Sequence, residues 1–535
     1  MTDIQYNFNN IIIDECVEDS FNEFLNDNEI QYPNLSNKKL EKWKFEEYLD
    51  RKKILPLNLE KEPGIIDLIP NLSNNSQNND NQLKLVKFFG TIRNACENQL
   101  YISAKYDSNN KKYFPNKFFE NKSYKMDLED DNSTNGNSIT ILSDRLELEL
   151  VPVVGINEYF DNKHDFEGKN KIKIIVYDYS NKYTKINQNI LVIGIAYESD
   201  NMIFIHSWKI LGNYEKFKIC REYNLLSDLN GNKTLYREKL KKILSKALKN
   251  DQLSADYLLL FLFGQIFSKL GEKNVGSFPL NIILDTNNDI NQSNDIYSNL
   301  LNIFKKICCK IKDIKLTTSE LNHSFYYPRF DTESEELYPG ELQLSDGTFL
   351  MVDEININEG KLDEIGVKNI GALKSLIDFQ VLGYEYPYNK IEINHDIEIL
   401  IVSHKAKSIL YSPFLTLLPI ISNNNDNDND NESETPNEND FKYIFYYLNY
   451  IRYDPSYGDK FIINEEISQA IQKNYIKNNP KYKHDDFDLV YLLTRFHALS
   501  CGKNHMTYED YEYVMNLEKQ RKQRLNNYNQ AKAIK

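Results

Sequence analysis

The spacing of apolar residues changes along the chain, and the first 80 residues show only short helical stretches. Apolar positions predict one helix around residues 21–25 and another around residues 40–48. The polar tract 73–80 follows, rich in Asn and without an apolar residue. Such a tract buries too little surface to offset the entropy lost on ordering. Residues 1–80 are therefore interpreted as a partly helical, partly disordered segment that ends in a linker.

From residue 83 the pattern becomes that of β-strands, rich in β-branched residues and separated by Asn, Asp and Gly. The predicted strands cover residues 85–92, 100–103, 146–154, 172–177, 190–196 and 202–206. Five or six short strands in one segment favour a small closed barrel of the oligonucleotide/oligosaccharide-binding (OB) type. This OB-like domain is assigned to residues 81–210, with 106–140 as a long loop. Residues 211–250 are interpreted as a connector.

Helices and apolar strands alternate in residues 251–421, which is the pattern of a parallel sheet. The predicted helices cover residues 255–270, 296–311 and 367–379, and the predicted strands cover residues 278–284, 314–318, 349–354 and 397–402. Residues 384–394 are expected to form a hairpin. Residues 422–440 follow as an acidic insert rich in Asn and Asp, which is interpreted as disordered.

The remaining residues, 441–535, have helical periodicity. Asn464 is placed to cap one helix, a stripe from 489 to 499 defines a second, and Thr507 with Asp510 forms a capping box that opens the last. A helical subdomain after an α/β core takes the position of the lid in AAA+ ATPases. The predicted fold class is α/β plus β: an OB-like barrel, a degenerate AAA+-like α/β domain without a P-loop, and a helical lid.

An acidic pair ends the most informative strand. The run from Phe349 to Val352 is apolar and leads into Asp353 and Glu354, the form of a buried parallel strand whose carboxylates emerge at its C-terminal end. In P-loop ATPases an Asp at this position holds Mg²⁺, and in the AAA+ branch the Glu polarises the attacking water.

The group that would hold a nucleotide's phosphates is missing from the sequence. There is no G-x-x-x-x-G-K-[ST] motif. The strand that ends at Asp285 continues through residues 286–293 without a Gly or a Lys, and Asp289 adds a carboxylate that repels phosphate. Asp353 and Glu354 are therefore predicted to be an inactive remnant. No catalytic residue, cofactor or metal ligand is assigned, and the chain is not expected to be an enzyme.

Composition and charge narrow the function further. The formal net charge of −15 over 535 residues disfavours a large basic surface for nucleic acid, so direct DNA binding is not expected. The six cysteines form no C-x-x-C motif and are expected to be reduced. The most apolar stretch, residues 258–267, is about half the length that a membrane-spanning helix needs, so no membrane segment is expected.

Several blocks resemble proteins of DNA replication. Residues 342–405, which contain the Asp353–Glu354 strand and the helix that follows it, look like the Walker-B to sensor-1 region of the minichromosome maintenance (MCM) helicase. Residues 255–260, 340–344 and 360–374, in this order, are similar to the MCM-binding protein family. The similarity extends from about residue 83 to about residue 525.

The resemblance implies a function that the residues alone do not give. It implies a nuclear, non-catalytic protein that binds MCM helicase subunits and promotes disassembly or unloading of the complex from chromatin. It further implies roles in the cell cycle, mitosis, cell division and sister chromatid cohesion. Two alternatives stay open: a single-stranded-DNA-binding replication factor that uses the barrel, and a nucleotide-dependent AAA+ enzyme with an unrecognised site.

Overall fold

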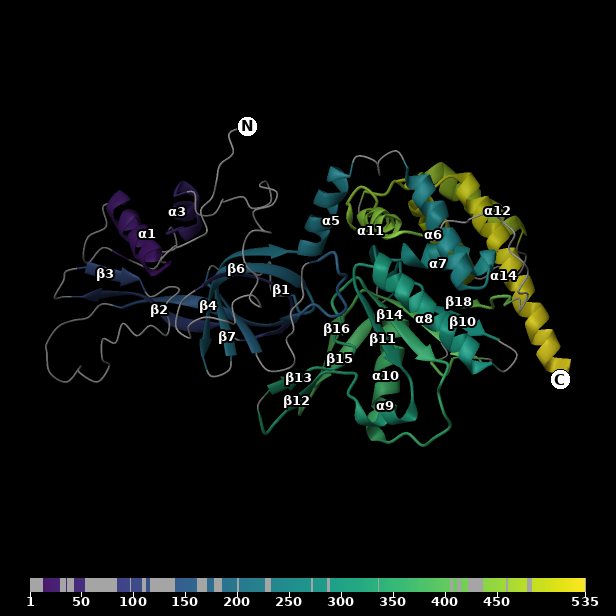
Figure 1. Cartoon of the computed structure of the whole chain (residues 1–535), viewed down its shortest axis with the longest axis horizontal. Helices are drawn as coiled ribbons and strands as arrows, with labels where there is room; N and C mark the ends of the chain where they lie inside the picture. The colour runs from purple at the N-terminus through teal and green to yellow at the C-terminus, as the bar shows by residue number, and fades with distance from the viewer. Residues whose placement is uncertain are drawn as a thin grey trace. The chain divides into compact units, whose positions relative to one another are not determined.

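The computed structural model places two compact units along the chain (Figure 1). It describes residues 13–28, 35, 43–52, 84–96, 98–107, 112–115, 140–160, 171–177, 185–199, 202–226, 232–270, 273–285, 289–334, 336–404, 408–410, 415–421, 436–458, 460–478 and 484–534. The first unit comprises Met1–Val153 and Asn162–Tyr214, and the second comprises Val154–Asp161 and Glu215–Lys535. The second unit is thus not one continuous stretch of chain.

A sheet that closes on itself forms the centre of the first unit. Its strands are β1 (Lys84–Ala95), β4 (Thr140–Pro152), β5 (Lys171–Val176), β6 (Asn189–Ser199) and β7 (Met202–Gly212). β1 pairs with both β6 and β4, so the order β1-β6-β7-β5-β4 returns to β1. All these pairs are antiparallel except β5 with β7. Alternate residues of the five strands, such as Phe88, Leu148 and Ile174, point into one shared core.

The predicted strands of this unit are confirmed. The predicted loop 106–140 is partly wrong, because strands occupy residues 106–107, 112–115 and 140. β2 (Gln99–Asp107) pairs with β3 (Lys112–Pro115), a strand that the sequence pattern missed. Helices α1 (Ile13–Asp27) and α3 (Phe45–Arg51) correspond to the two predicted N-terminal helices, the second beginning five residues later than expected. The polar tract 73–80 lies outside the described residues.

A parallel sheet forms the centre of the second unit, as the alternation of helices and strands predicted. Its strand order is β11-β14-β17-β10-β18, and every neighbouring pair is parallel. The strands are β10 (Leu280–Leu284), β11 (Ile311–Lys315), β14 (Thr348–Glu354), β17 (Ile397–His404) and β18 (Leu415–Leu417). β10 and β14 are buried along their whole length, which explains why their sequences are apolar without alternation.

The helices of the second unit follow the predicted positions with one clear exception. α10 (Glu364–Phe379) agrees with the prediction, and α8 (Ile290–Ile307) overlaps the predicted helix 296–311 but begins six residues and ends four residues before it. α7 (Gln252–Leu262) ends eight residues before the predicted end. After α7 the chain turns at Gly264 and pairs with another segment: Phe267 N donates to Val275 O, and β8 (Ser268–Leu270) pairs with β9 (Lys273–Val275). A continuous apolar run does not reveal this change from helix to strand.

The second unit also contains a smaller, four-stranded sheet. It has the strand order β13-β12-β15-β16, with β12 (Arg329–Asp331) and β13 (Glu336–Tyr338) preceding β14. β15 (Val381–Glu385) and β16 (Lys390–Asn394) form the predicted hairpin. The short helix α9 (Thr318–His323) packs on α10.

The C-terminal helices confirm the predicted caps. They are α11 (Glu438–Tyr453), α12 (Glu465–Asn478), α13 (His484–Ser500) and α14 (Tyr508–Ile534), the long yellow helix of Figure 1. Asn464 accepts a hydrogen bond from Glu466 N at 2.9 Å, and Thr507 and Asp510 cap one another reciprocally. None of the helices among the described residues is long and apolar enough to cross a membrane.

Two predicted boundaries need correction. The insert predicted at 422–440 ends earlier, because α11 begins at Glu438 and Asn437 forms a capping box with Asp440. The predicted connector 211–250 is largely helical: α5 (Tyr214–Leu225) and α6 (Lys233–Ala247) lie within it. α6 packs on α7, α8 and α11, so it is part of the second unit's helical layer.

Candidate functional site

The acidic pair lies at the C-terminal end of β14, where ligands bind in parallel sheets. Asp353 is in register with Lys315 of β11 and with Val402 of β17. Its side chain and that of Glu354 are buried, with residue exposures of 4% and 3%. The sequence therefore placed both residues at the right edge of the sheet, but it did not show that the folded chain covers them.

Asp353 is held by the chain that follows it. Its Oδ1 accepts a hydrogen bond from Ile355 N at 2.9 Å, which turns the backbone at the end of the strand. Burial raises the pKa of Asp353, although this hydrogen bond and the nearby Lys315 ammonium act in the opposite direction. Burial, with a smaller contribution from the Asp353 carboxylate, raises the pKa of Tyr297. The carboxylate thus faces a partly apolar surrounding.

Glu354 binds a segment after β17. Its Oε1 accepts from Ser408 Oγ at 2.6 Å, and Ser408 Oγ in turn accepts from Leu410 N at 3.0 Å. Burial raises the pKa of Glu354, opposed by hydrogen bonds from Ser408 and from the backbone of Ile409 and Leu410. A carboxylate oxygen that is engaged in this way is not free to orient an attacking water. The geometry favours a structural contact.

The start of α8 is where a phosphate would bind in a P-loop enzyme. Here the side chain of Asp289 caps the helix, with Oδ1 accepting from Asn291 N at 3.0 Å and from Gln292 N at 3.3 Å. One turn further on, Ser293 Oγ is hydrogen-bonded to Nδ1 of His404, the last residue of β17, at 3.1 Å. The helix N–H groups available for an anion are therefore used by a carboxylate, which would also repel a phosphate.

A group of three potential metal ligands lies elsewhere, between α13 and α14. The ligand atoms of His497, Cys501 and Asp510 lie within 4.8 Å of one another. However, Lys503 Nζ donates to both oxygens of Asp510, at 2.9 and 3.2 Å, and His497 Nδ1 lies 2.9 Å from Oδ1. A metal ion would have to displace the Lys503 ammonium, so the arrangement is better explained as a hydrogen-bonded link between the helices.

Sequence reasoning missed this group, although a local signal was present. His497 is in the last turn of α13 and Cys501 directly follows the helix, four residues later, and Asp510 belongs to the predicted capping box. Burial raises the pKa of Asp510, but hydrogen bonds from His497, Thr507 and Lys503 outweigh it and hold the pKa well below its usual value. The Asp510 carboxylate is thus charged and bound by its neighbours.

Comparison with known sequences identifies relatives of the second unit. A sequence model of the family described as "Mini-chromosome maintenance replisome factor" matches residues 204–525, more than half of the 535-residue chain. The match begins in β7 and reaches α14, so it includes the Asp353–Glu354 edge and the C-terminal helices. Most of the closed sheet lies outside it, although the resemblance seen in the sequence was expected to begin near residue 83.

Individual relatives share the name "Mini-chromosome maintenance complex-binding protein". The protein of Gallus gallus is 29% identical over 311 residues, covering 56% of this chain and 46% of that protein. The protein of Arabidopsis thaliana is 28% identical over 295 residues (54% and 47%), and that of Homo sapiens is 25% identical over 322 residues (58% and 48%). The chain spans about half the length of these curated relatives. It belongs to the mini-chromosome maintenance replisome factor family.

Proposed function

We propose that this chain is a non-enzymatic regulator of DNA replication that binds subunits of the MCM replicative helicase. In this proposal binding promotes disassembly of the complex and its unloading from chromatin. The observation that carries the proposal is the family match over residues 204–525, together with the name of the relatives, which describes binding to the MCM complex. The proposed place of action is the nucleus.

The second unit is proposed to be a degenerate AAA+-like scaffold. A parallel sheet with an acidic pair at the end of β14, followed by the C-terminal helices, supports this interpretation. The engaged carboxylates of Asp289 and Glu354 support the absence of ATP turnover. For the first unit we propose the OB class, because five strands close on one another with a single parallel pair.

A scaffold of this kind offers a mechanism that needs no hydrolysis. A protein that resembles a helicase subunit can compete for the face that one subunit presents to the next. Such competition shifts the assembly equilibrium only if the protein binds the free subunit more tightly than the assembled ring. We propose that residues 251–535 provide this contact. Support of sister chromatid cohesion, mitosis and cell division is proposed as a consequence of timely unloading.

The proposal is tested by binding the full chain to isolated helicase subunits and to assembled hexamers. We expect tighter binding to a subunit than to the hexamer, and a decrease in the hexamer population as the protein is added. Equal binding to both, or binding to neither, would contradict the disassembly mechanism. Titrations with ATP and with single-stranded DNA on the same preparation address the two alternative functions, and neither ligand is expected to bind.

A further inference from the structure

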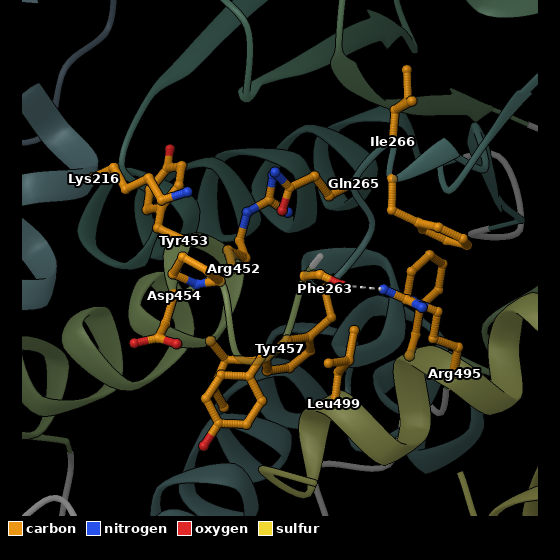
Figure 2. A pocket seen from close by; sticks show the side chains of 15 residues that line it. Lys216, Phe263, Gln265, Ile266, Arg452, Tyr453, Asp454, Tyr457, Arg495 and Leu499 are labelled. Carbon is orange, nitrogen blue, oxygen red and sulfur yellow. Dashed lines mark hydrogen bonds between the residues drawn. The ribbon is translucent and has the colours of Figure 1, made fainter. Parts of the chain in front are cut away.

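Two buried arginines line a pocket in the second unit (Figure 2). Arg452 comes from the end of α11 and Arg495 from α13, and each residue is 6% exposed. The segment after α7, including Phe263 and Phe267, forms another part of the wall. The pocket lies at the amino end of the parallel sheet, whereas the acidic pair lies at the carboxyl end. The backbone N–H of its lining residue Ile266 donates to Asp396, the residue directly before β17.

Arg495 is a buried cation that has no carboxylate within ion-pair distance among the described residues. Its guanidinium carbon lies 3.8 Å from the ring centroid of Phe267 and 4.2 Å from that of Phe461. Nη2 donates to Gly458 O at 3.1 Å, the bond drawn in Figure 2, while Nε has no hydrogen-bond partner among the residues that the structure describes. Burial lowers the pKa of Arg495 to about 10, so it remains charged at neutral pH.

Arg452 adds positive potential to the same pocket. It donates from Nη1 to the carbonyl oxygens of Leu262 (2.8 Å) and Gly264 (2.5 Å). Two carboxyl groups, those of Asp396 and Glu398, interact with it electrostatically, but neither lies within ion-pair distance. Glu398 is fully buried, and burial raises its pKa to about 8, so it is largely uncharged at neutral pH. The charge of Arg452 is therefore only partly compensated.

The other charged residues of the lining compensate one another. Hydrogen bonds from Ser456 and the charge of Lys216 outweigh burial and lower the pKa of Asp454. Asp454 is thus ionised, and the charge of Lys216 offsets part of its negative charge. This leaves the Arg495 guanidinium, which has no ion-pair partner in the described part of the chain, as the feature that distinguishes the pocket, in a chain whose net charge is −15. A buried charge without a partner is unfavourable, and an incoming anion would remove that cost.

We propose that this pocket binds a carboxylate of a partner polypeptide, either an acidic side chain or a free C-terminus. The rings of Phe267 and Phe461 pack against the Arg495 guanidinium, so a ligand would reach the guanidinium through the N–H groups at its edge. A planar carboxylate fits such an edge with charge-assisted hydrogen bonds. The two phenylalanine rings themselves supply no hydrogen-bond donor beside Arg495, which suits a carboxylate better than a phosphate with its additional oxygens. The identity of the partner protein does not enter this inference, so it stands apart from the proposed function.

The test uses the full chain and blocked tripeptides as probes. Acetyl-glycyl-glutamyl-glycinamide is titrated against its glutamine counterpart, with the Arg side-chain N–H resonances of the protein as the readout. We expect the glutamate peptide to bind at least about tenfold more tightly, the ratio that one charge-assisted hydrogen bond typically supplies, and to shift the Arg495 Nε–H signal. Acetyl-triglycine with a free carboxylate distinguishes the C-terminal source from the side-chain source.

Variants separate the pocket from general electrostatics. Arg495→Gln should weaken binding of the glutamate peptide at least about tenfold, and Arg495→Lys should restore it only in part, because lysine lacks the planar fork. Lys477→Gln, the loss of an exposed cation on α12, is the matched control and should leave binding unchanged. Equal binding of the two peptides, unchanged affinity in Arg495→Gln, or shifts produced by inorganic phosphate alone would each overturn the proposal. If Arg495→Gln does not fold, the titration of the wild-type chain decides by itself.

Discussion

The buried ion pair of Lys310 offers a sharp test of how the second unit is stabilised. Lys310 precedes β11, and its side chain is completely buried. Nζ lies 3.1 Å from Glu215 Oε1 and donates to Asp346 O at 2.6 Å. Changing Lys310 to Met removes both contacts and leaves the Glu215 carboxylate, itself only 8% exposed, without its cation.

The structure sets the size of the expected effect. Removing one partner of a buried pair costs about 3–5 kcal/mol, most of it from the charge left behind. In a unit of this size, such a loss lowers the melting temperature by about 2 °C for each kcal/mol, or roughly 6–10 °C in total. Urea denaturation followed by circular dichroism measures the free energy of unfolding, and a thermal scan measures the shift.

Two further variants decide whether the reasoning holds. The double change Lys310→Met with Glu215→Gln removes the stranded charge and should recover at least about 1–2 kcal/mol relative to the single variant. The exposed pair of Lys306 and Glu438, at 2.7 Å, is the control, and Lys306→Met should cost less than about 1 kcal/mol. A single Lys310 variant as stable as the wild type, or a double variant no better than the single one, would refute the argument.

Three further predictions concern the acidic edge, the insert and the response to pH. Glu354→Gln should leave the affinity for nucleotides unchanged. Calorimetry that finds ATP binding tighter than about 10 μM in the wild type but not in the variant would contradict the inactive-remnant interpretation. Deleting residues 423–435 should leave the melting temperature nearly unchanged, whereas deleting 423–439 also removes the Asn437 cap and should cost about 1 kcal/mol. Burial raises the folded pKa of Glu398 to about 8. Its contribution to stability is therefore fully present below the unfolded value near 4.5 and is lost as the pH rises to about 8. Denaturation curves of Glu398→Gln measured across this pH range should lack the corresponding decrease in the free energy of unfolding.

The sequence predicted features that depend on neighbouring residues. The capping roles of Asn464 and Thr507 involve groups two or three positions away, so local residue types are sufficient to find them. The position of Asp353 at a strand end followed from the apolar run before it. Where an apolar run had no period, as at 257–263, the prediction that one helix continues to residue 270 was wrong.

The features that were missed depend on residues far apart in the chain. The pair of Lys310 and Glu215 is separated by 95 positions, and the walls of the arginine pocket come from segments near 263, 452 and 495. No local pattern indicates that such side chains meet. The same holds for Glu354, whose partner Ser408 lies 54 positions later and determines whether its carboxylate is available for chemistry.

The segment Val154–Asp161 has a consequence for how the chain must be produced and dissected. Asn157 N donates to Cys309 O at 2.9 Å, and Asn157 Nδ2 donates to Lys305 O at 2.7 Å, so this segment completes the layer beside β11. During synthesis this segment leaves the ribosome about 150 residues before its partners and cannot form these contacts until those partners are made. At that point the first unit also lacks β5, β6 and β7. A fragment that starts at Glu215 would lack these contacts, so neither unit is obtained by a single cut of the chain.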